Sequence, residues 1–254
     1  MLPLQQTFTE ASKPAARTKT PELGGRGTDM LKAFLDRRPA TEGRLASLRA
    51  RLRNPLKRGF DVVSGTLLLV WLLPVLLGVI LLVRLDGGPA FYAHWRVGRH
   101  GRVFPCFKFR SMVVDADAAL VALLRDDPKA AEEWAAGHKL QRDPRVTRIG
   151  RILRSTSMDE LPQLFNVLRG DMSLVGPRPV THGEIKTLYG PYAKDYMTVR
   201  PGLTGLWQVS GRSVTSYDDR VALDMAYINR PSLRADLRIL LRTVRVVALR
   251  HGAY

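Results

Sequence analysis

The longest uninterrupted apolar stretch covers residues 62–83, VVSGTLLLVWLLPVLLGVILLV, and carries no charged side chain. At a rise of roughly 1.5 Å per residue, a helix of this length would cross the apolar core of a bilayer. Because it is apolar on every face, it would need burial on every side in a soluble domain. The pattern therefore favours a membrane helix over the buried helix of a soluble domain.

Pro74 interrupts this stretch near its middle, where its ring crowds the carbonyl of Val70 and it has no backbone N–H to donate. A kink or break is therefore expected there. Basic residues mark the cytoplasmic side of membrane proteins, and here they flank both ends. They are Arg49, Arg51, Arg53, Lys57 and Arg58 before the stretch, and Arg84, Arg96, Arg99, Arg102 and Lys108 after it. These features favour a re-entrant helix over about residues 56–84, with a kinked spanning helix as the alternative.

The chain after the apolar stretch shows the patterns of a small α+β domain. In residues 87–112, aromatic and β-branched residues alternate with basic ones between Gly and Pro, which predicts a short β-element. Helices are predicted over residues 115–136 and 157–168. In the second, Ser157 as N-cap and Glu160 three residues later predict a capping box. The fold class predicted is thus α+β, mainly helical, with short β-elements.

A further helix is predicted over residues 232–249, with leucines and valines on one side and arginines elsewhere. This pattern is typical of an amphipathic helix lying in a membrane interface, although a core helix would look similar. Residues 1–48 are polar and basic, with Pro and Gly and without a secretory signal, and we expect them to form a flexible cytoplasmic extension. Residues 49–254 are expected to form the catalytic domain.

The composition adds a strong charge imbalance: 40 Lys and Arg against 23 Asp and Glu give a formal net charge of +17. This favours partners that carry phosphate, namely nucleic acid, anionic lipid headgroups or phosphorylated substrates. The sequence has no helix-turn-helix, zinc or RNA-binding signature, so nucleic acid is not the expected partner. The single cysteine, Cys106, excludes an internal disulfide and agrees with a reducing, cytoplasm-facing environment.

Four strings dense in charge, glycine and proline stand out along the chain. They are KRGFD at residues 57–61, KFRSM at 108–112, RSTSMDELPQLFNVLRGDMSLVGPRP at 154–179 and VRPGLTGLWQVSGRS at 199–213. In this order they resemble the bacterial sugar transferase family, the monotopic polyprenyl-phosphate phosphoglycosyl transferases. The resemblance covers about residues 55–254. It implies a small member that carries the catalytic domain alone, with Leu73-Pro74 where the family often breaks its membrane helix at Ser-Pro.

The resemblance also implies a reaction. In the family, an aspartate of an Asp-Glu pair is the nucleophile, and this position falls on Asp159, with Glu160 beside it. The expected activity transfers a hexose-1-phosphate, galactose or glucose, from a UDP-sugar to undecaprenyl phosphate through an aspartyl phosphosugar, releasing UMP. Aspartyl phosphates are established covalent intermediates. The product would start an exopolysaccharide or other surface glycan at the cytoplasmic face of the bacterial inner membrane.

Attack on a diphosphate requires neutralisation of charge, normally by magnesium and by Arg or Lys. Mg²⁺ is the expected cofactor, with Asp159 as its candidate ligand, and Glu160 is expected to position magnesium, act on a proton or cap its helix. The candidates for phosphate contacts are Lys108, Arg154, Arg178 and Arg212. For any single arginine, a solvated face or a lipid headgroup contact is an equal alternative.

Other functions stay open on the sequence alone. A membrane-bound scaffold of the same fold, or a basic protein that binds lipid or nucleic acid, would share the apolar stretch or the charge. The expected partners are a UDP-sugar, undecaprenyl phosphate and membrane lipid. The amphipathic helix at the C-terminal end could also serve a homodimer.

Overall fold

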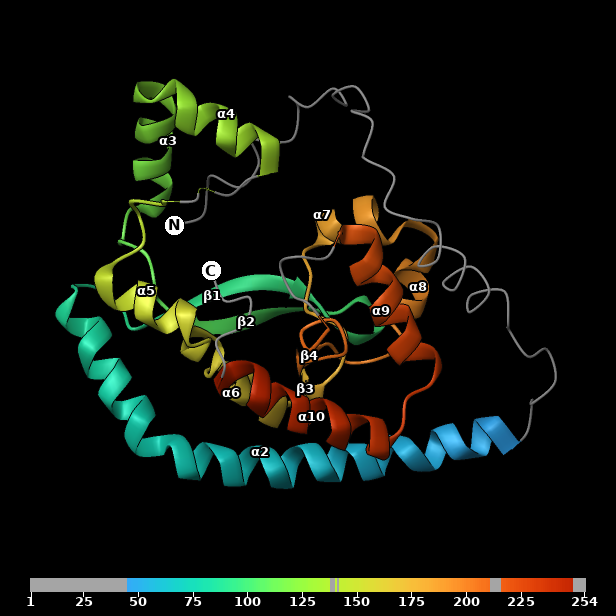
Figure 1. Cartoon of the computed structure of the whole chain (residues 1–254). Coiled ribbons are helices and arrows are strands. Elements are labelled where there is room, and N and C mark those ends of the chain that lie inside the picture. Colours follow the sequence, from blue (N-terminus) through green and yellow to red (C-terminus); the bar gives the residue numbers. More distant parts are fainter. Residues whose placement is uncertain (1–44, 138–139, 141, 211–215, 249–254) are drawn as a thin grey trace. The chain divides into compact units, whose positions relative to one another are not determined.

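A computed structural model of the chain describes residues 45–137, 140, 142–210 and 216–248, all within the unit Thr41–Tyr254 (Figure 1). The extension expected at residues 1–48 lies outside the described residues, apart from its last four, which open helix α2. Arg212, one of the candidate phosphate ligands, also lies outside them.

The described elements are mainly helical, with two pairs of short strands, as predicted from the sequence. In chain order the longer helices are α2 (Leu45–Leu85), α3 (Ala116–Asp126), α4 (Pro128–Gly137), α5 (Arg148–Ser155), α6 (Gln163–Arg169), α9 (Tyr217–Asn229) and α10 (Leu233–Ala248). The short helical turns are η1 (Arg99–Gly101), η2 (Met158–Glu160), α7 (His182–Glu184), η3 (Ile185–Tyr189), η4 (Gly190–Tyr192) and α8 (Ala193–Tyr196). The strands are β1 (Phe91–Val97), β2 (Val103–Phe109), β3 (Ser173–Val175) and β4 (Gly202–Thr204).

Two small sheets organise these elements. Strands β1 and β2 form an antiparallel hairpin in which Phe91 faces Phe109 and Val97 faces Val103. This hairpin is the β-element predicted over residues 87–112. Strands β3 and β4 pair in parallel, with Ser173 opposite Gly202. The second pair lies at the centre of the main core, where buried side chains of α6, β2, α9 and α10 meet.

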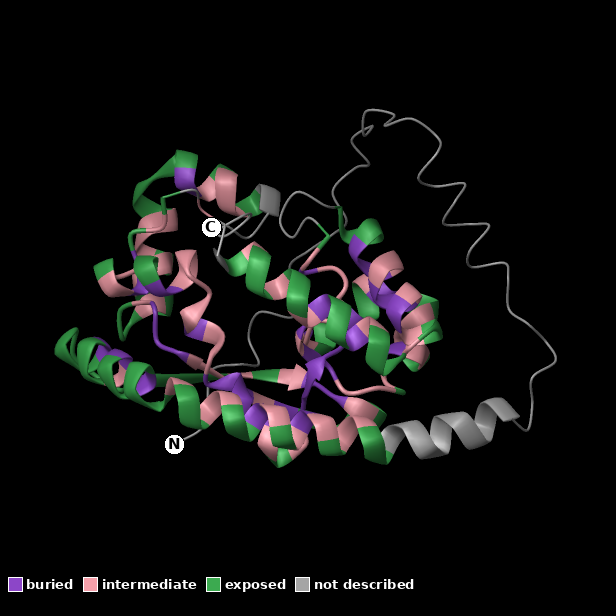
Figure 2. Ribbon diagram, turned by 60° about the horizontal axis from the view of Figure 1, so that its bottom comes forward, coloured by how far each residue is buried: buried purple, intermediate pink, exposed green. Residues whose placement is uncertain are grey.

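Helix α2 contains the apolar stretch. Its segment Pro55–Leu85 has a window of mean hydropathy 2.9, of which 17% is buried, and it is the one helix within the described residues that is long and apolar enough to cross a membrane. The helix is continuous through Pro74, and Figure 1 shows that it changes direction along its length. A proline inside a helix produces such a change. Figure 2 shows exposed positions along much of this long helix.

Buried polar contacts hold the part of α2 just before its apolar stretch against the rest of the domain. The Asp61 carboxylate, 1% exposed, accepts hydrogen bonds from Ser173 Oγ at 3.0 Å and from the Leu174 backbone N–H at 3.1 Å. Four residues earlier, Lys57 Nζ donates to Asp236 Oδ2 of α10 at 2.8 Å. The apolar helix is therefore fixed to both β3 and α10 by its polar end.

Asp61→Ala is expected to loosen this attachment. The substitution leaves the buried Leu174 N–H without an acceptor, which costs about 1–3 kcal/mol in the free energy of unfolding. Thermal unfolding in detergent, followed by tryptophan fluorescence, should show a lower melting temperature. Asp86→Ala is the matched control, because it removes an exposed carboxylate just beyond the other end of α2. Equal melting temperatures for the two variants would contradict the attachment.

The helix predicted over residues 115–136 was wrong in one respect: the structure divides it into α3 and α4 at Asp127. Pro128 disfavours helical backbone in the residue before it, and Asp127 accordingly adopts an extended conformation. The Asp127 carboxylate then accepts hydrogen bonds from the backbone N–H groups of Lys129 and Ala130, at 2.9 and 3.2 Å. Asp127 therefore starts a new helix.

The helix predicted over residues 157–168 is also divided, into η2 and α6, with Pro162 between them. The predicted capping box was wrong as well. Ser157 has a left-handed backbone, with φ at 57°, and its side chain makes no capping hydrogen bond. This left-handed residue ends the run from α5 and turns the chain abruptly into η2. Asp159 and Glu160 therefore lie on a tight, separate turn.

The C-terminal helix agrees with its prediction to within one residue at each end, since α10 covers Leu233–Ala248. One face packs on the core through Ile239, which is 4% exposed. The opposite apolar side chains stay uncovered in the described structure. They are Leu237, Leu241 and Val244, at 54, 65 and 70% exposed.

Candidate active site

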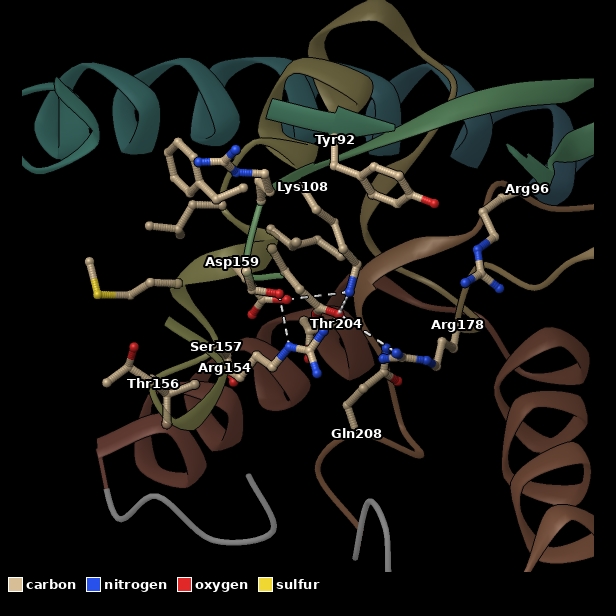
Figure 3. Close-up of a pocket in the computed structure, with 18 of the residues that line it drawn as sticks. Tyr92, Arg96, Lys108, Arg154, Thr156, Ser157, Asp159, Arg178, Thr204 and Gln208 are labelled. Carbon is tan, nitrogen blue, oxygen red and sulfur yellow. Dashed lines mark hydrogen bonds and ion pairs between the residues drawn. The ribbon is translucent and has the colours of Figure 1, made fainter. Parts of the chain in front are cut away.

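A large pocket of about 1360 Å³ opens between the hairpin, the η2 turn, α2 and α10. Figure 3 shows the charged side chains in it pointing toward one another. The structure thus brings together five of the six candidate site residues, which come from β2, α5, η2 and the loop after β3. They are Lys108, Arg154, Asp159, Glu160 and Arg178.

Asp159 lies at the inner side of this pocket, where the whole residue is 8% exposed. Lys108, the last but one residue of β2, places its Nζ atom 3.5 Å from Asp159 Oδ2. On the other side, Arg154 lines the same pocket and donates from Nε to Ser111 Oγ at 2.8 Å, which fixes its side chain. Asp159 is therefore a buried carboxylate between cationic side chains.

Glu160 occupies a different position from its neighbour. Its Oε1 atom lies 2.8 Å from Lys108 Nζ and 3.6 Å from Arg178 Nη2. Glu160 therefore holds the two cations beside Asp159, and its contact with Lys108 is the shorter one. The two carboxylates are therefore placed differently: that of Asp159 is buried at the inner side of the pocket, and that of Glu160 contacts the cations around it.

The surroundings of Asp159 act on its pKa in opposing directions. Burial raises the pKa of this carboxyl above its ordinary value, and the negative charge of Glu160 adds to the rise. The positive charges of Lys108 and Arg154 lower it. A desolvated carboxylate kept ionised by nearby cations is a stronger nucleophile than one in water, because less hydration must be lost on attack.

Arg178 is fixed from both sides. Its guanidinium lies over the Trp207 ring, with 5.6 Å between the guanidinium carbon and the ring centre. Burial opposes its charge, but Glu160 and Glu184 raise the pKa of the guanidinium above its usual value. Behind it, Tyr196 donates its hydroxyl to the Arg178 carbonyl at 3.1 Å. The tight loop after β3 thus presents a rigid cation to the pocket.

Sequence reasoning missed several pocket residues. Arg96 of β1 donates to Glu184 Oε2 at 3.0 Å. In the sequence it was interpreted only as one of the basic residues that follow the apolar stretch. Trp207 and Gln208 belong to the string at residues 199–213, so their place in that string could have indicated them as pocket residues. Arg220 of α9 carries no local motif, and only the tertiary fold brings it to the pocket.

Apolar side chains also line this pocket. They come from the membrane-helix candidate α2 and from α10. The lining side chains are Leu68, Leu72 and Val75 of α2, and Leu240, Val244 and Val247 of α10. One cavity therefore has both cationic and apolar side chains in its lining.

The model of the bacterial sugar transferase family matches residues 52–250. The chain belongs to the bacterial sugar transferase family. This confirms the resemblance drawn from the four sequence strings, and the match covers all five site residues that the structure brings together.

Relatives within the bacterial sugar transferase family are close in sequence. An undecaprenyl-phosphate galactose phosphotransferase of Salmonella typhimurium is 50% identical over 208 residues, which cover 82% of this chain and 44% of that protein. A UDP-galactose-lipid carrier transferase of Erwinia amylovora is 52% identical over 202 residues, covering 78% and 42%. The chain thus spans less than half the length of these relatives. The exopolysaccharide production protein ExoY of Rhizobium meliloti is 49% identical over 199 residues, covering 78% and 88%.

Proposed function

We propose that this chain transfers hexose-1-phosphate from a UDP-sugar to undecaprenyl phosphate, with galactose or glucose as the hexose. The observation that carries the proposal is the buried Asp159 carboxylate among Lys108, Arg154 and Arg178, in a pocket that apolar side chains of α2 and α10 also line. Such a pocket matches an acceptor with a phosphate head and an isoprenoid chain. The names of two relatives, which mention undecaprenyl phosphate and a lipid carrier, support the same assignment.

The first step is a displacement at the sugar-bearing phosphate. A carboxylate oxygen of Asp159 forms a bond to this phosphorus, while the bond to the bridging oxygen breaks and UMP leaves with the electron pair. The product is an aspartyl phosphosugar. In the second step, a phosphate oxygen of undecaprenyl phosphate attacks the same phosphorus. The acyl phosphate bond breaks, and Asp159 returns to its carboxylate.

The cations near Asp159 would stabilise the negative charge that develops in both steps. Lys108 lies closest, 3.5 Å from the carboxylate, and Arg154 and Arg178 line the same pocket. Fixed cations in a partly dry site stabilise developing negative charge without the reorganisation that water requires. Because Glu160 contacts both Lys108 and Arg178, we assign it the role of positioning these two side chains.

Magnesium could bind at Asp159 and Glu160 if the phosphates of the substrate complete its coordination. Among the described residues, no group of three His, Cys, Asp or Glu side chains could hold a metal ion. Mg²⁺ usually binds through one or two carboxylates together with substrate phosphates, so a site completed by the substrate needs no such group. We propose Asp159 as the protein ligand, with Glu160 beside it. When bound, the ion would neutralise part of the diphosphate charge.

The location proposed is the cytoplasmic face of the inner membrane. Helix α2 supplies a long apolar surface, and α10 leaves Leu237, Leu241 and Val244 uncovered. Basic residues at both ends of the apolar stretch support a re-entrant α2 over a spanning one. This arrangement would place the apolar side chains that line the pocket at the depth of the isoprenoid chain. The product would initiate a surface polysaccharide.

A UMP-release assay across a panel of UDP-sugars tests the proposal. The purified chain is expected to release UMP from UDP-galactose or UDP-glucose, and to form a lipid-linked sugar when undecaprenyl phosphate is added. A non-catalytic scaffold would bind the lipid and release no UMP from any member of the panel. That second result would overturn the proposed function.

A further inference from the structure

Arg220 of α9 is a buried cation with unmet hydrogen-bonding capacity. The residue is 6% exposed and lines the same pocket as Asp159. Its Nη1 atom lies 3.7 Å from Glu184 Oε1, while Nε and Nη2 have no hydrogen-bond partner among the described residues. Buried donors without an acceptor cost free energy, and for a charged group the cost is larger. A partner outside the chain would remove this cost.

The neighbours of Arg220 orient it but do not use its two open donors. The guanidinium carbon lies 5.0 Å from the ring centre of Trp207 and 6.0 Å from that of Tyr217. Aromatic faces attract a cation and hold its plane, yet they offer no oxygen acceptor. Trp207 also lies beside Arg178, so one aromatic side chain contacts the two cations.

The nearest carboxylate is shared among several donors. Glu184 Oε2 accepts from Arg96 at 3.0 Å and from the Thr181 backbone N–H at 2.7 Å. Burial raises the pKa of Glu184, but the Thr181 N–H, Arg96 and Arg220 together hold it below the ordinary value. Glu184 is therefore ionised, and its charge is divided between two arginines. It does not meet the Nε and Nη2 edge of Arg220.

Two other arginines within the described residues, though not the buried Arg110, behave differently. Arg145 donates from Nε and Nη2 to the two carboxylate oxygens of Asp143, at 2.8 and 2.7 Å. Arg58 donates to two backbone carbonyls of α6, those of Val167 and Leu168. In both residues, two guanidinium nitrogens meet oxygen acceptors within the protein. In Arg220, the edge that Arg145 uses for a bidentate contact meets no such acceptor in the part of the chain that the structure describes.

We propose that Arg220 is a phosphate-binding residue, whose Nε and Nη2 atoms together receive a phosphate group of a substrate beside the Asp159 site. A planar guanidinium edge matches two oxygens of a phosphate, and such charge-assisted pairs are both strong and directional. The assignment of this phosphate to a substrate rests on the proposed function. The phosphate can belong to the uridine nucleotide or to the lipid acceptor, since both present the same oxygens.

Equilibrium binding to the full chain in lipid nanodiscs tests this inference. The probes are UMP, uridine and undecaprenyl phosphate, and the variants are Arg220→Gln and Arg220→Lys. We expect Arg220→Gln to weaken UMP binding about tenfold or more and to leave uridine binding unchanged, because uridine has no phosphate. Arg220→Lys keeps the charge but loses the planar fork, so its affinity should fall between those of the wild type and Arg220→Gln.

Arg125→Gln is the matched control, because Arg125 is exposed on α3 and pairs with its neighbour Asp126. It should bind every probe as the wild type does. If Arg220→Gln weakens undecaprenyl phosphate binding and leaves UMP binding unchanged, the phosphate group is that of the lipid, and the site stands. If a folded Arg220→Gln or Arg220→Lys variant binds both UMP and undecaprenyl phosphate with wild-type affinity, the inference is overturned.

These binding measurements need no turnover, so they separate the inference from the proposed function. A wild-type chain that releases no UMP from any UDP-sugar, but binds UMP through Arg220, would overturn the function and keep the phosphate site. If the wild-type chain turns over normally and the Arg220 variants bind all probes as tightly as the wild type, the proposed function stands and the phosphate site is overturned. Melting temperatures identify any variant that has not folded, and for this reason both substitutions are made.

Discussion

Asp159→Asn is expected to abolish hexose-1-phosphate transfer, with turnover reduced by about 10³-fold or more, as for the loss of a covalent nucleophile. Asparagine has nearly the shape of aspartate but forms no acyl phosphate. The fold should tolerate the change. Burial raises the pKa of Asp159, so the ionised side chain is less favourable in the folded protein than in the unfolded chain, and the neutral amide avoids this cost.

The measurement combines UMP release with transfer to the lipid, after the variant is shown to reside in the membrane fraction with a melting temperature at least equal to that of the wild type. Asp126→Asn is the matched control, because that carboxylate is 61% exposed and pairs with the exposed Arg125. It should retain full activity. Near-normal turnover by a folded Asp159→Asn would remove Asp159 from the role of nucleophile.

Lys108→Gln is expected to have the second largest effect, a loss of about 10²-fold or more in kcat/KM, because it removes a fixed cation from the reacting carboxylate. Unlike Asp159→Asn, it should leave residual activity, since the nucleophile remains. The substitution should also change the pH dependence of kcat/KM. Lys108 lowers the pKa of Asp159, so without it that pKa rises further. Activity that requires the ionised carboxylate will then be lost at a higher pH as the solution is acidified.

The pH dependence of kcat/KM for wild type and Lys108→Gln provides the check, and the acid limb of the variant should lie at higher pH. Lys129→Gln on α4 is the control, as it removes an exposed lysine that lies outside the pocket lining. An acid limb that stays in place, or moves to lower pH, would mean that Lys108 does not act on the carboxylate whose ionisation controls the rate.

Local sequence patterns predicted the elements whose signals are local. The membrane-helix candidate, the hairpin and α10 follow from hydrophobic periodicity and length, which neighbouring residues determine. The breaks at Asp127 and Pro162 coincide with prolines, although the residues around them have the composition of helices. The left-handed backbone of Ser157 could not be predicted in this way. Its conformation depends on how α5 and η2 pack against β2, and so on contacts that are distant in sequence.

Some residues of the site could likewise be predicted from local sequence, and others could not. Lys108, Arg154, Asp159 and Arg178 were found because they stand in strings that resemble a family, and the fold then brought these strings together. Arg96 and Arg220 stand outside those strings. They reach the pocket because β1 pairs with β2 and because α9 packs behind Trp207. Only the tertiary structure shows that the edge of Arg220 meets no partner among the residues that it describes.

The covalent intermediate on Asp159 is the central claim, and mass spectrometry of the enzyme after incubation with a UDP-hexose alone tests it most directly. Without undecaprenyl phosphate the second displacement cannot occur, so the phosphosugar should accumulate on the enzyme. We predict a hexose-phosphate adduct on the peptide that contains Asp159, formed together with one UMP and removed when undecaprenyl phosphate is added. An adduct on another residue, or UMP release that requires the lipid and leaves no adduct, would contradict it.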